Sequence, residues 1–319
     1  MNSEITNFLV ASFYCFSSIN KPQILANTMK NVCNSLKLRG TIIISVEGIN
    51  GTVAGHPKGI KANMDFLKEQ GFHNLNTKFS ESSEMPFYRM KVKVKKEIIS
   101  MLNNPIDTDS ERGTLIDAKN WNDVMAQDDV ILIDTRNEYE TSIGTFQNAI
   151  LPQIQSFQDF KAYIDTELIN YKDKKIAMFC TGGIRCEKAS YYMKQIGFSD
   201  VVQLNGGILK YLEDIPQDES RWNGECFVFD GRVSVNNKLE KGSFELCRGC
   251  NLPLSHDDKN LPGYEKDVSC SRCVDAKSDF KKNNSRERSR QIQIAKDRGI
   301  PSVYVTGSIE KHFPKNETN

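Results

Sequence analysis

The sequence predicts an α/β protein of three parts, and three observations lead to this prediction. Segments with strand and helix patterns follow one another in the order β-α-β-β-α-β within residues 1–105. Within residues 115–222, short apolar strands alternate with helical segments, which is typical of a parallel sheet covered by helices. Residues 223–319 contain two pairs of closely spaced cysteines in a polar background. Because one hydrophobic core rarely serves a chain of 319 residues, we expect these three ranges to be separate domains.

The N-terminal part is predicted to be an α+β sandwich. We expect strands at Phe8–Phe16, Thr41–Val46, Thr52–Gly55 and Leu75–Phe79, and helices at Pro22–Leu38 and Gly59–Gln70. The Asn50-Gly51 pair predicts a tight hairpin turn between the second and third strands, since these residues readily adopt positive φ. This element order is that of a ferredoxin-like sandwich, a fold that hosts many functions and identifies none of them.

A basic strand follows this part of the chain. An extended chain places Arg89, Lys91, Lys93 and Lys95 on one face, and Met90, Val92 and Val94 on the other. Four like charges in a row repel one another unless an anion lies across them, and a nucleic-acid backbone is such an anion. The alternative is an edge strand whose lysines block aggregation. We favour nucleic-acid contact, because a second basic cluster lies near the C-terminus.

The central part contains the segment with the clearest chemistry. The loop Cys180-Thr181-Gly182-Gly183-Ile184-Arg185 lies between an apolar strand, Lys175–Phe179, and a helical segment, Cys186–Ile196. Backbone N–H groups of such a loop converge on the cysteine sulfur, and the helix dipole adds positive potential. With the charge of Arg185 they lower a thiol pKa from about 8.5 and favour the reactive thiolate. We therefore predict that Cys180 and Arg185 are catalytic and that residues 181–184 bind an anion.

This loop resembles the active-site loop of rhodanese (sulfurtransferase) domains, in which four residues separate the cysteine from the arginine. Three further segments match that family in order: Val130–Arg136, Ile143–Ile150 and Val201–Gly207. The resemblance implies a rhodanese fold with a parallel sheet for about residues 115–215. Ser142 stands where the family has a histidine. We expect Asp134 and Arg136 to form a salt bridge that supports the loop.

The C-terminal part contains a candidate metal site. Cys247 and Cys250 form one C-x2-C pair, and Cys270 and Cys273 form a second after nineteen intervening residues. Four thiolates at this spacing can close a tetrahedral structural zinc site. Free thiols and a redox pair are the alternatives. We favour zinc, because the polar loop between the pairs cannot form a sizeable core unaided.

A second basic segment follows the cysteines. Ser285 is expected to cap a helix whose exposed face carries Arg286, Arg288 and Arg290. These arginines are candidate phosphate contacts. For this segment taken alone, a solvated surface helix is the better interpretation.

Composition limits the remaining possibilities. The net charge is +1, and no apolar stretch is long enough to span a bilayer. The N-terminus lacks the pattern of a signal peptide, and nine cysteines with C-x2-C pairs argue for a reducing compartment. We therefore expect a cytoplasmic protein with no membrane partner. No flavin, haem or NAD site is visible, and the four histidines form no iron-binding pattern.

The whole chain resembles one family. Glu47–Thr52, Arg89–Lys93, the Cys180 loop and Gly224–Val233 occur in this order in the bacterial tRNA uridine hydroxylases, which are rhodanese-domain enzymes of the UPF0176 group, and the cysteine pairs match as well. The resemblance implies an oxidoreductase that uses molecular oxygen as co-substrate. Its reaction converts the wobble uridine (position 34) of tRNA to 5-hydroxyuridine, and the essential cysteine of the family falls on Cys180.

Two other functions stay open at this point. The alternatives to a hydroxylase are a persulfide-forming sulfurtransferase and a non-catalytic RNA-binding adaptor. In the hydroxylase interpretation, Cys180 adds to C6 of uridine or carries a persulfide or an oxidised sulfur. The sequence does not determine the oligomeric state.

Overall fold

The computed structural model describes residues 7–108 and 110–298, and the chain divides into two compact units. The first unit comprises Met1–Met85 and Met90–Gly242, and the second comprises Pro86–Arg89 and Ser243–Asn319. Two of the three expected domains thus lie within the first unit. Their boundaries near residues 105, 115 and 222 stay a prediction.

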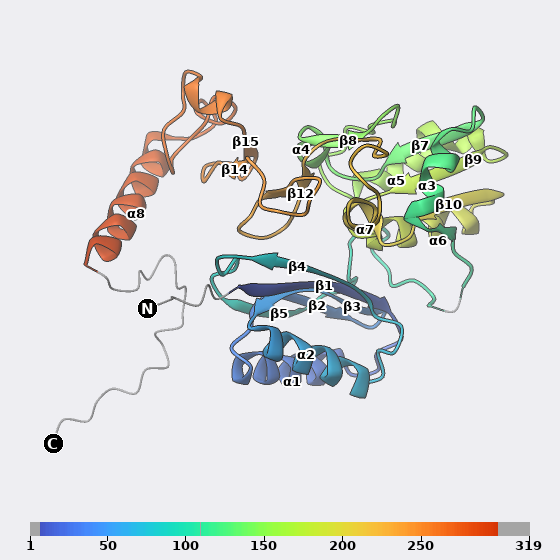
Figure 1. The fold of residues 1–319 in the computed structure, drawn as a ribbon, viewed down its shortest axis with the longest axis horizontal. Coiled ribbons are helices and arrows are strands. Elements are labelled where there is room, and N and C mark those ends of the chain that lie inside the picture. The colour runs from blue at the N-terminus through green and yellow to red at the C-terminus, as the bar shows by residue number, and fades with distance from the viewer. Residues whose placement is uncertain (1–6, 109, 299–319) are drawn as a thin grey trace. The chain divides into compact units, whose positions relative to one another are not determined.

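The N-terminal sheet has five strands, and two helices belong to it (Figure 1). Its elements are β1 (Phe8–Phe16), α1 (Pro22–Ser35), β2 (Arg39–Ser45), β3 (Gly48–Gly55), α2 (Pro57–Glu69), β4 (Asn76–Ser82) and β5 (Met90–Val94). The strand order is β4-β1-β3-β2-β5, with antiparallel pairs except for the parallel pair of β2 and β5. The first four strands have the ferredoxin-like arrangement that the sequence predicts, and the basic strand β5 is an added edge.

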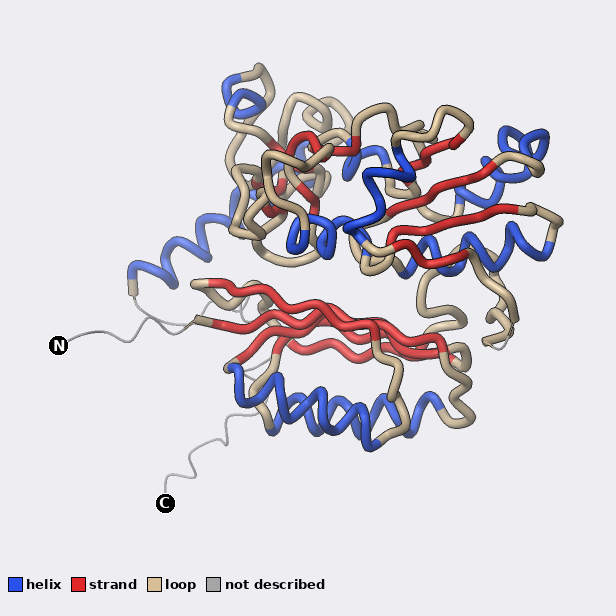
Figure 2. The backbone as a smooth tube through the Cα atoms, turned by 45° about the vertical axis from the view of Figure 1, so that its right-hand side comes forward, coloured by secondary structure: helices blue, strands red, loops and turns tan. Residues whose placement is uncertain are grey.

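Both helices cover the same face of this sheet (Figure 2). Alternate residues of β1, Ala11, Phe13 and Cys15, point to that face and are buried with Met29 of α1 and Leu67 of α2. The intervening residues of β1 point to the helix-free face. Because successive side chains of a strand alternate, the sequence pattern of β1 and β4 determines which polar groups lie on that second face.

The predicted turn at Asn50-Gly51 is wrong. The hairpin turns at Val46 and Glu47, since Ser45 pairs with Gly48, and Asn50 and Gly51 lie inside β3. Two contacts explain their identity instead. The Asn50 side chain donates to the Ile98 carbonyl at 3.1 Å, and a Cβ on Gly51 would lie 2.9 Å from the Phe13 ring.

The central sheet has four parallel strands in the order β6-β10-β9-β7. Its elements are β6 (Thr114–Ile116), α3 (Ala118–Met125), β7 (Val130–Asp134), α4 (Glu138–Thr141), α5 (Asp159–Tyr163), η1 (Ile164–Leu168), η2 (Ile169–Tyr171), β9 (Lys175–Phe179), α6 (Ile184–Gln195), β10 (Asp200–Leu204) and α7 (Gly207–Asp214). Alternate residues of β9 enter two different cores: Ile176 and Met178 pack with α5 and α6, and Ala177 and Phe179 pack with α3 and α7. Helices therefore cover both faces, as expected for a buried parallel strand.

Short strands complete the chain. β8 (Gly144–Phe146) pairs with β11 (Trp222–Gly224), β12 (Cys226–Phe227) pairs with β13 (Ser234–Val235), and β14 (Glu245–Leu246) pairs with β15 (Pro253–Leu254). The second unit also contains η3 (Asp257–Asn260) and α8 (Asp279–Asp297). Ser285 does not cap α8, because the helix begins earlier and the Ser285 hydroxyl donates to the Lys281 carbonyl within it at 3.0 Å. No helix among the described residues is long and apolar enough to cross a membrane.

A buried cluster of charges joins α6 to the N-terminal half of the first unit. The Lys188 ammonium lies 2.9 and 3.1 Å from the carboxylate oxygens of Glu47 and 2.5 Å from Glu97, and it also donates to the Ile99 carbonyl at 3.0 Å. The Lys188 and Glu47 side chains are fully buried, and Glu97 is 3% exposed. Backbone N–H groups also donate to these carboxylates. Ile98 and Ile106 donate to Glu47, and residues 101–103 donate to Glu97. Such saturation is what makes a buried ion cluster tolerable.

We expect Lys188→Met to lower the free energy of unfolding by about 3–5 kcal/mol, because it leaves two carboxylates buried without a cation. Chemical denaturation of the purified chain measures this change. Adding Glu47→Gln and Glu97→Gln to Lys188→Met should restore part of the loss, since no uncompensated charge then remains.

Lys210→Met is the matched control. Lys210 pairs with Glu213 and Asp214 while 42% exposed, so its loss should cost less than about 1 kcal/mol. Equal losses in Lys188→Met and Lys210→Met would show that the buried cluster does not hold the first unit together.

Candidate active site

Cys180 lies directly after β9, and α6 begins four residues later at Ile184. The Gly183 N–H donates to the Cys180 sulfur at 3.0 Å. Gly183 has a φ of 101°, which an L side chain rarely adopts, and a Cβ there would lie 2.9 Å from the Tyr14 hydroxyl. The loop therefore has the shape that the sequence predicts, with the sulfur inside a ring of backbone donors.

The turn between β10 and α7 and the first residues of α7 contact the backbone of this loop. The N–H groups of Ile208 and Leu209 donate to the carbonyls of Cys180 and Thr181 at 2.9 and 3.1 Å. Gly207 has a φ of 67°, and a Cβ on it would lie 2.5 Å from the Cys180 carbonyl oxygen. The close approach of the two turns explains the glycine pair Gly206-Gly207 after β10.

Charge and hydrogen bonds act on the thiol of Cys180. Burial opposes ionisation, but the Cys186 thiol, the Arg185 guanidinium and backbone N–H groups at 185 and 186 outweigh it and lower the pKa of Cys180 from 9.0 to about 6. Burial has the largest effect on the neighbouring thiol and raises the pKa of Cys186 well above its ordinary value. Cys180 is therefore a thiolate at neutral pH and Cys186 is a protonated donor beside it.

Arg185 has a partner that the sequence reasoning did not find. Its guanidinium donates to both carboxylate oxygens of Glu140 at 2.8 Å, and the Glu140 side chain is fully buried. Glu140 is in α4, where its carboxylate also accepts from the Asn137 N–H at 3.2 Å. This bidentate pair orients Arg185 toward the loop. The signal that could have found Glu140 is a carboxylate in the short segment just after Asp134-Thr135-Arg136, which lie at the end of β7.

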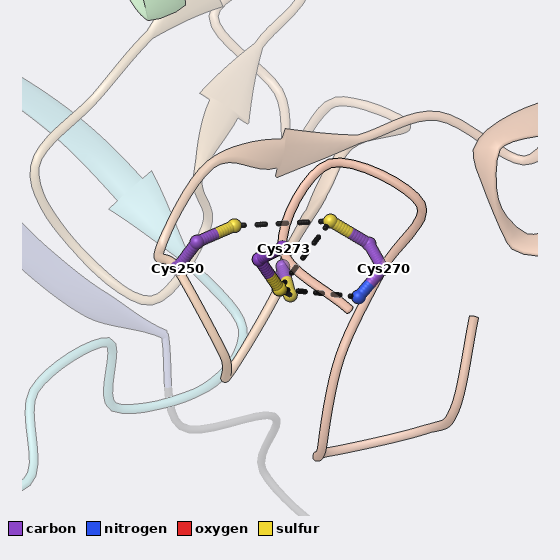
Figure 3. Close-up of side chains that lie close together, drawn as sticks. Cys250, Cys270 and Cys273 are labelled. Atoms are coloured by element: carbon purple, nitrogen blue, oxygen red, sulfur yellow. Dashed lines mark hydrogen bonds between the residues drawn. The ribbon is translucent and has the colours of Figure 1, made fainter. Parts of the chain in front are cut away.

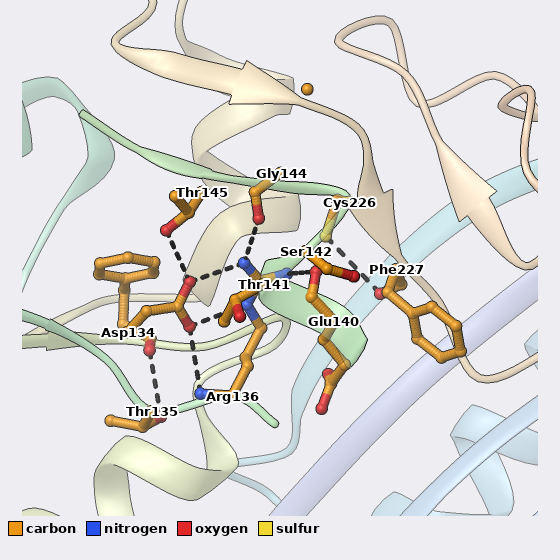
Figure 4. A network of polar contacts seen from close by, with 12 residues as sticks. Asp134, Thr135, Arg136, Glu140, Thr141, Ser142, Gly144, Thr145, Cys226 and Phe227 are labelled. Atoms are coloured by element: carbon orange, nitrogen blue, oxygen red, sulfur yellow. Dashed lines mark hydrogen bonds and ion pairs between the residues drawn. The ribbon is translucent and has the colours of Figure 1, made fainter. Parts of the chain in front are cut away.

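Asp134 and Arg136 form the expected salt bridge (Figure 4). Their side chains are fully buried, and Arg136 donates to the two carboxylate oxygens of Asp134 at 2.9 and 2.7 Å. Arg136 also donates to the Gly144 carbonyl at 2.6 Å, and the Thr145 hydroxyl donates to Asp134 at 2.8 Å. The pair thus links β7 to β8 and does not touch the Cys180 sulfur, and its predicted support of the Cys180 loop stays a prediction.

Polar side chains of the N-terminal sheet reach the loop, and the sequence reasoning missed them. Lys78 of β4 donates to the Gly182 carbonyl at 2.9 Å and hydrogen-bonds the Asn76 side chain. Asn76 in turn donates to the Tyr14 hydroxyl at 3.3 Å. All three residues lie on the helix-free face, since Tyr14 pairs with Asn76 and alternation adds Lys78. Burial lowers the pKa of Lys78 from 10.5 to about 8, while the nearby Cys180 opposes this shift.

The four cysteines of the second unit meet at one point (Figure 3). The sulfur atoms of Cys247 and Cys273 are 3.8 Å apart, and Cys270 lies 3.7 Å from Cys250 and 3.9 Å from Cys273. All four lie within 4.8 Å of one another. Sulfur atoms about 2.3 Å from a tetrahedral centre are separated by roughly 3.8 Å, so this arrangement can hold a metal ion.

The basic residues are at the surface but are not all free. On the edge strand β5, Lys93 is exposed and Lys91 is half-buried. Lys95 is exposed just after this strand, and Arg89 is exposed in the second unit. On α8, Arg288 is half-buried. Arg286 donates to Glu265 at 2.6 Å, and Arg290 donates to Glu287 at 2.8 Å. A phosphate that binds these two arginines replaces exposed ion pairs, which are weak.

Comparisons with known proteins show which family the chain resembles over most of its length. Residues 8–98 match the UPF0176 acylphosphatase like domain, and residues 117–214 match the rhodanese-like domain. The tRNA uridine(34) hydroxylase of Teredinibacter turnerae is 46% identical over 92% of this chain and 92% of its own length. The protein of the same name from Bartonella henselae is 45% identical over 93% of this chain and 98% of its own length. Among solved structures, a rhodanese-related protein from Thermoplasma volcanium covers 32% of this chain and 95% of its own, at 24% identity and a TM-score of 0.27.

We expect alkylation of Cys180 to show a midpoint near pH 6, because the thiolate reacts and its fraction rises as the pH passes the pKa of about 6. Peptide mapping by mass spectrometry after brief iodoacetamide treatment at several pH values measures this. At pH 7, labelling should favour Cys180 over Cys15, Cys33 and Cys226, whose pKa values burial raises to about 11, 12 and 12.

Variants separate the causes of the lowered pKa of Cys180. Arg185→Met combined with Glu140→Gln should raise the midpoint by about 1–3 pH units, since it removes the guanidinium without leaving a buried carboxylate. Lys78→Met should raise it by less, because Lys78 bonds the loop carbonyl and not the sulfur. An unchanged midpoint in the Arg185 variant would contradict the electrostatic explanation.

Proposed function

Because the chain belongs to the tRNA uridine(34) hydroxylase family, we propose that it hydroxylates the wobble uridine of tRNA to 5-hydroxyuridine. One observation carries the step from family to chemistry. Cys180 has a pKa of about 6 in a loop whose backbone donors and arginine favour an anionic sulfur. A thiolate of this kind is a nucleophile suited to an electron-poor carbon such as C6 of uracil.

In the first form of the mechanism, the Cys180 thiolate adds to C6 and the electron pair of the C5–C6 double bond moves to C5. C5 then attacks dioxygen, C5 loses its proton, and the thiolate leaves C6 so that the ring regains its double bond. One oxygen atom remains as the 5-hydroxyl group. The second leaves as water, with two electrons and two protons supplied by an external reductant. Arg185 and the loop donors hold the sulfur charge before attack and after release.

In the second form, dioxygen with two electrons from the external reductant and protons from solvent first oxidises the Cys180 thiolate, or a persulfide that it carries, to a species with an S–OH group, and the other oxygen atom leaves as water. The S–OH oxygen is then transferred to C5, the S–O bond breaks so that the sulfur returns to its reduced form, and C5 loses its proton. Both forms use the same residues. Cys180 is 1% exposed, so in either form the groups around the sulfur shift when a base approaches. The contacts of Lys78 and Tyr14 with Gly182 and Gly183 place side chains of the N-terminal sheet among these groups.

The proposed substrate requires a surface for a polyanion. The proposed phosphate contacts of the first basic segment are Lys91 and Lys93 on β5, Arg89 before it and Lys95 after it. Those of the second basic segment are Arg286, Arg288 and Arg290. Such contacts release counterions, so tRNA affinity falls steeply with salt. A tRNA substrate also agrees with the expected cytoplasmic location.

The four-cysteine cluster is proposed to hold a structural zinc ion. Its spacing fits tetrahedral thiolate coordination, and zinc with four thiolates has no open position for chemistry. The cysteines connect β14 and β15 to the loop before α8, where few other apolar residues pack. Zinc would therefore stabilise the second unit and take no part in oxygen activation.

Sulfur transfer is a second candidate function, favoured by the six-residue loop from Cys180 to Arg185. In that reaction thiosulfate gives its outer sulfur to Cys180 and leaves as sulfite, and cyanide then accepts the sulfur as thiocyanate. A thiosulfate–cyanide assay measures it directly. High activity in that assay without formation of 5-hydroxyuridine would favour this function over hydroxylation.

We expect 5-hydroxyuridine derivatives to disappear from the tRNA of cells that lack this protein and carry no redundant pathway. Wild-type protein should restore them, and Cys180→Ala should restore less than about 1% of the wild-type level, since loss of a covalent nucleophile removes the reaction path. Mass spectrometry of digested tRNA measures the nucleosides. Cys33→Ala, at a buried thiol in α1, is the matched control.

Full hydroxylation by Cys180→Ala would refute both forms of the mechanism. A fall in thiolated nucleosides with unchanged 5-hydroxyuridine would instead identify a sulfur carrier.

For the cysteine cluster, we expect elemental analysis to find about one zinc ion per chain and Cys270→Ser to lower this content below half. Because the metal stabilises a segment with few apolar contacts, a strong chelator should also expose α8 to proteolysis. Cys226→Ser, at a buried thiol outside the cluster, should keep its zinc. Full zinc content in Cys270→Ser would contradict the assignment.

A further inference from the structure

One exposed aromatic ring lies beside the candidate active site. Phe229 follows β12 and is 55% exposed. The Arg185 guanidinium lies over its ring, 5.5 Å from the ring centroid. Arg185 in turn acts on the charge of the Cys180 sulfur. The Phe229 ring therefore contacts the last residue of the reactive loop.

Two further aromatic side chains support Phe229. Its ring meets Phe227 edge to face, with centroids 5.2 Å apart and planes at 74°. Phe227 is 5% exposed and meets Tyr139 of α4 in the same way, at 5.2 Å and 78°. Phe227 is thus a core residue, whereas Phe229 is the exposed end of a row of three rings. Such edge-to-face pairs orient a ring as well as burying it.

The loop that carries Phe229 is closed by hydrogen bonds and contains one residue in a costly conformation. The Val228 N–H donates to the Val233 carbonyl at 2.9 Å, which closes the loop that contains Phe229. Val233 has a φ of 67°, an outlier for a β-branched residue. Arg232 donates to both carboxylate oxygens of Asp230 and to the Ser80 hydroxyl of β4, which fixes the loop. Backbone strain of this kind persists where surrounding contacts enforce it, and it concentrates at functional sites.

A single exposed aromatic residue is ordinary on a protein surface. Phe229 differs in three respects: it lies in a fixed loop that contains a strained residue, Val233, its ring packs against Phe227, and it adjoins Arg185. Every nucleobase has a flat π face that can stack on such a ring, so this contact does not depend on the RNA sequence. An enzyme that acts on C5 or C6 of a base must also take that base out of its stack and offer a replacement surface.

We propose that Phe229 is the stacking surface for the target pyrimidine, and that it holds the base beside the Cys180 loop. This inference rests on the proposed function, since it names the group that binds the uracil ring. Phe229 contacts the base and takes no part in bond making. The competing explanation is that Phe229 only covers the buried Arg185–Glu140 pair from solvent.

Paired RNA probes test this proposal with the full chain. The probes are two anticodon stem-loop RNAs of equal sequence, one with uridine at the wobble position and one with an abasic nucleotide there. Fluorescence anisotropy measures their affinities for wild type, Phe229→Leu, Phe229→Trp and Tyr171→Leu. Tyr171 in η2 is the matched control, because it is 47% exposed and precedes β9, at the opposite end of the strand from Cys180. Formation of 5-hydroxyuridine and the pH midpoint of Cys180 alkylation are measured on the same proteins.

We expect Phe229→Leu to weaken binding of the uridine probe on the order of tenfold and to leave the abasic probe unaffected. Phe229→Trp should retain uridine binding, Tyr171→Leu should match wild type, and the alkylation midpoint should stay in place. Equal binding of the uridine probe by wild type and Phe229→Leu would overturn the proposal. An equal loss of affinity for both probes would also overturn it. So would a shift in the pH midpoint of Cys180 alkylation without a selective loss of affinity for the uridine probe, because that result indicates that Phe229 only covers Arg185. If wild type forms no 5-hydroxyuridine and binds both probes equally, the proposed function fails and this inference fails with it.

Discussion

The contact between Lys188 and its two carboxylates is the constraint on which the site depends. Lys188 lies in the first turns of α6, the helix that begins at the end of the Cys180 loop. Glu47 lies in the β2–β3 turn, and Glu97 follows β5. A fully buried ammonium with two buried carboxylates tolerates little displacement, because each unpaired charge would be costly. The start of α6 is therefore fixed against the N-terminal sheet, and the Cys180 loop is fixed with it.

This constraint explains why side chains from distant segments act on one sulfur atom. With α6 in place, Lys78 and Tyr14 on the helix-free face of the N-terminal sheet meet Gly182 and Gly183. From the other direction, Glu140 orients Arg185 through two hydrogen bonds. The rhodanese-like loop supplies the donors that make a thiolate, and the N-terminal sheet supplies a cation near it. The acylphosphatase-like part thus contributes directly to the environment of the reactive group.

The second unit depends on a different kind of interaction. Among its described residues the core is small and consists mainly of the four cysteines with Leu254 and Tyr264. Hydrophobic burial on this scale rarely stabilises a fold alone, so a metal ion held by the four cysteines would take the place of a larger core. The helix α8 carries charged side chains paired with neighbouring carboxylates, such as Arg286 with Glu265. Exposed pairs of this kind contribute little to stability, so the phosphate contacts proposed for this helix would replace weak interactions.

Local patterns in the sequence determined the elements and the chemistry of single loops. Alternation in β1 and β9, the glycines after Cys180 and the C-x2-C spacing of each cysteine pair are patterns within a few residues, so they could be predicted without coordinates. The prediction of a turn at Asn50-Gly51 was wrong, because packing against Phe13 and a hydrogen bond to Ile98 override the local turn preference of these residues. Glu140, Lys78 and Tyr14 could not be assigned to the site, and neither could the exposure of Phe229, since their partners lie far away in the sequence. Only the tertiary structure decides which buried charges meet, because the electrostatic energy of a pair depends on distance in space and not on separation along the chain.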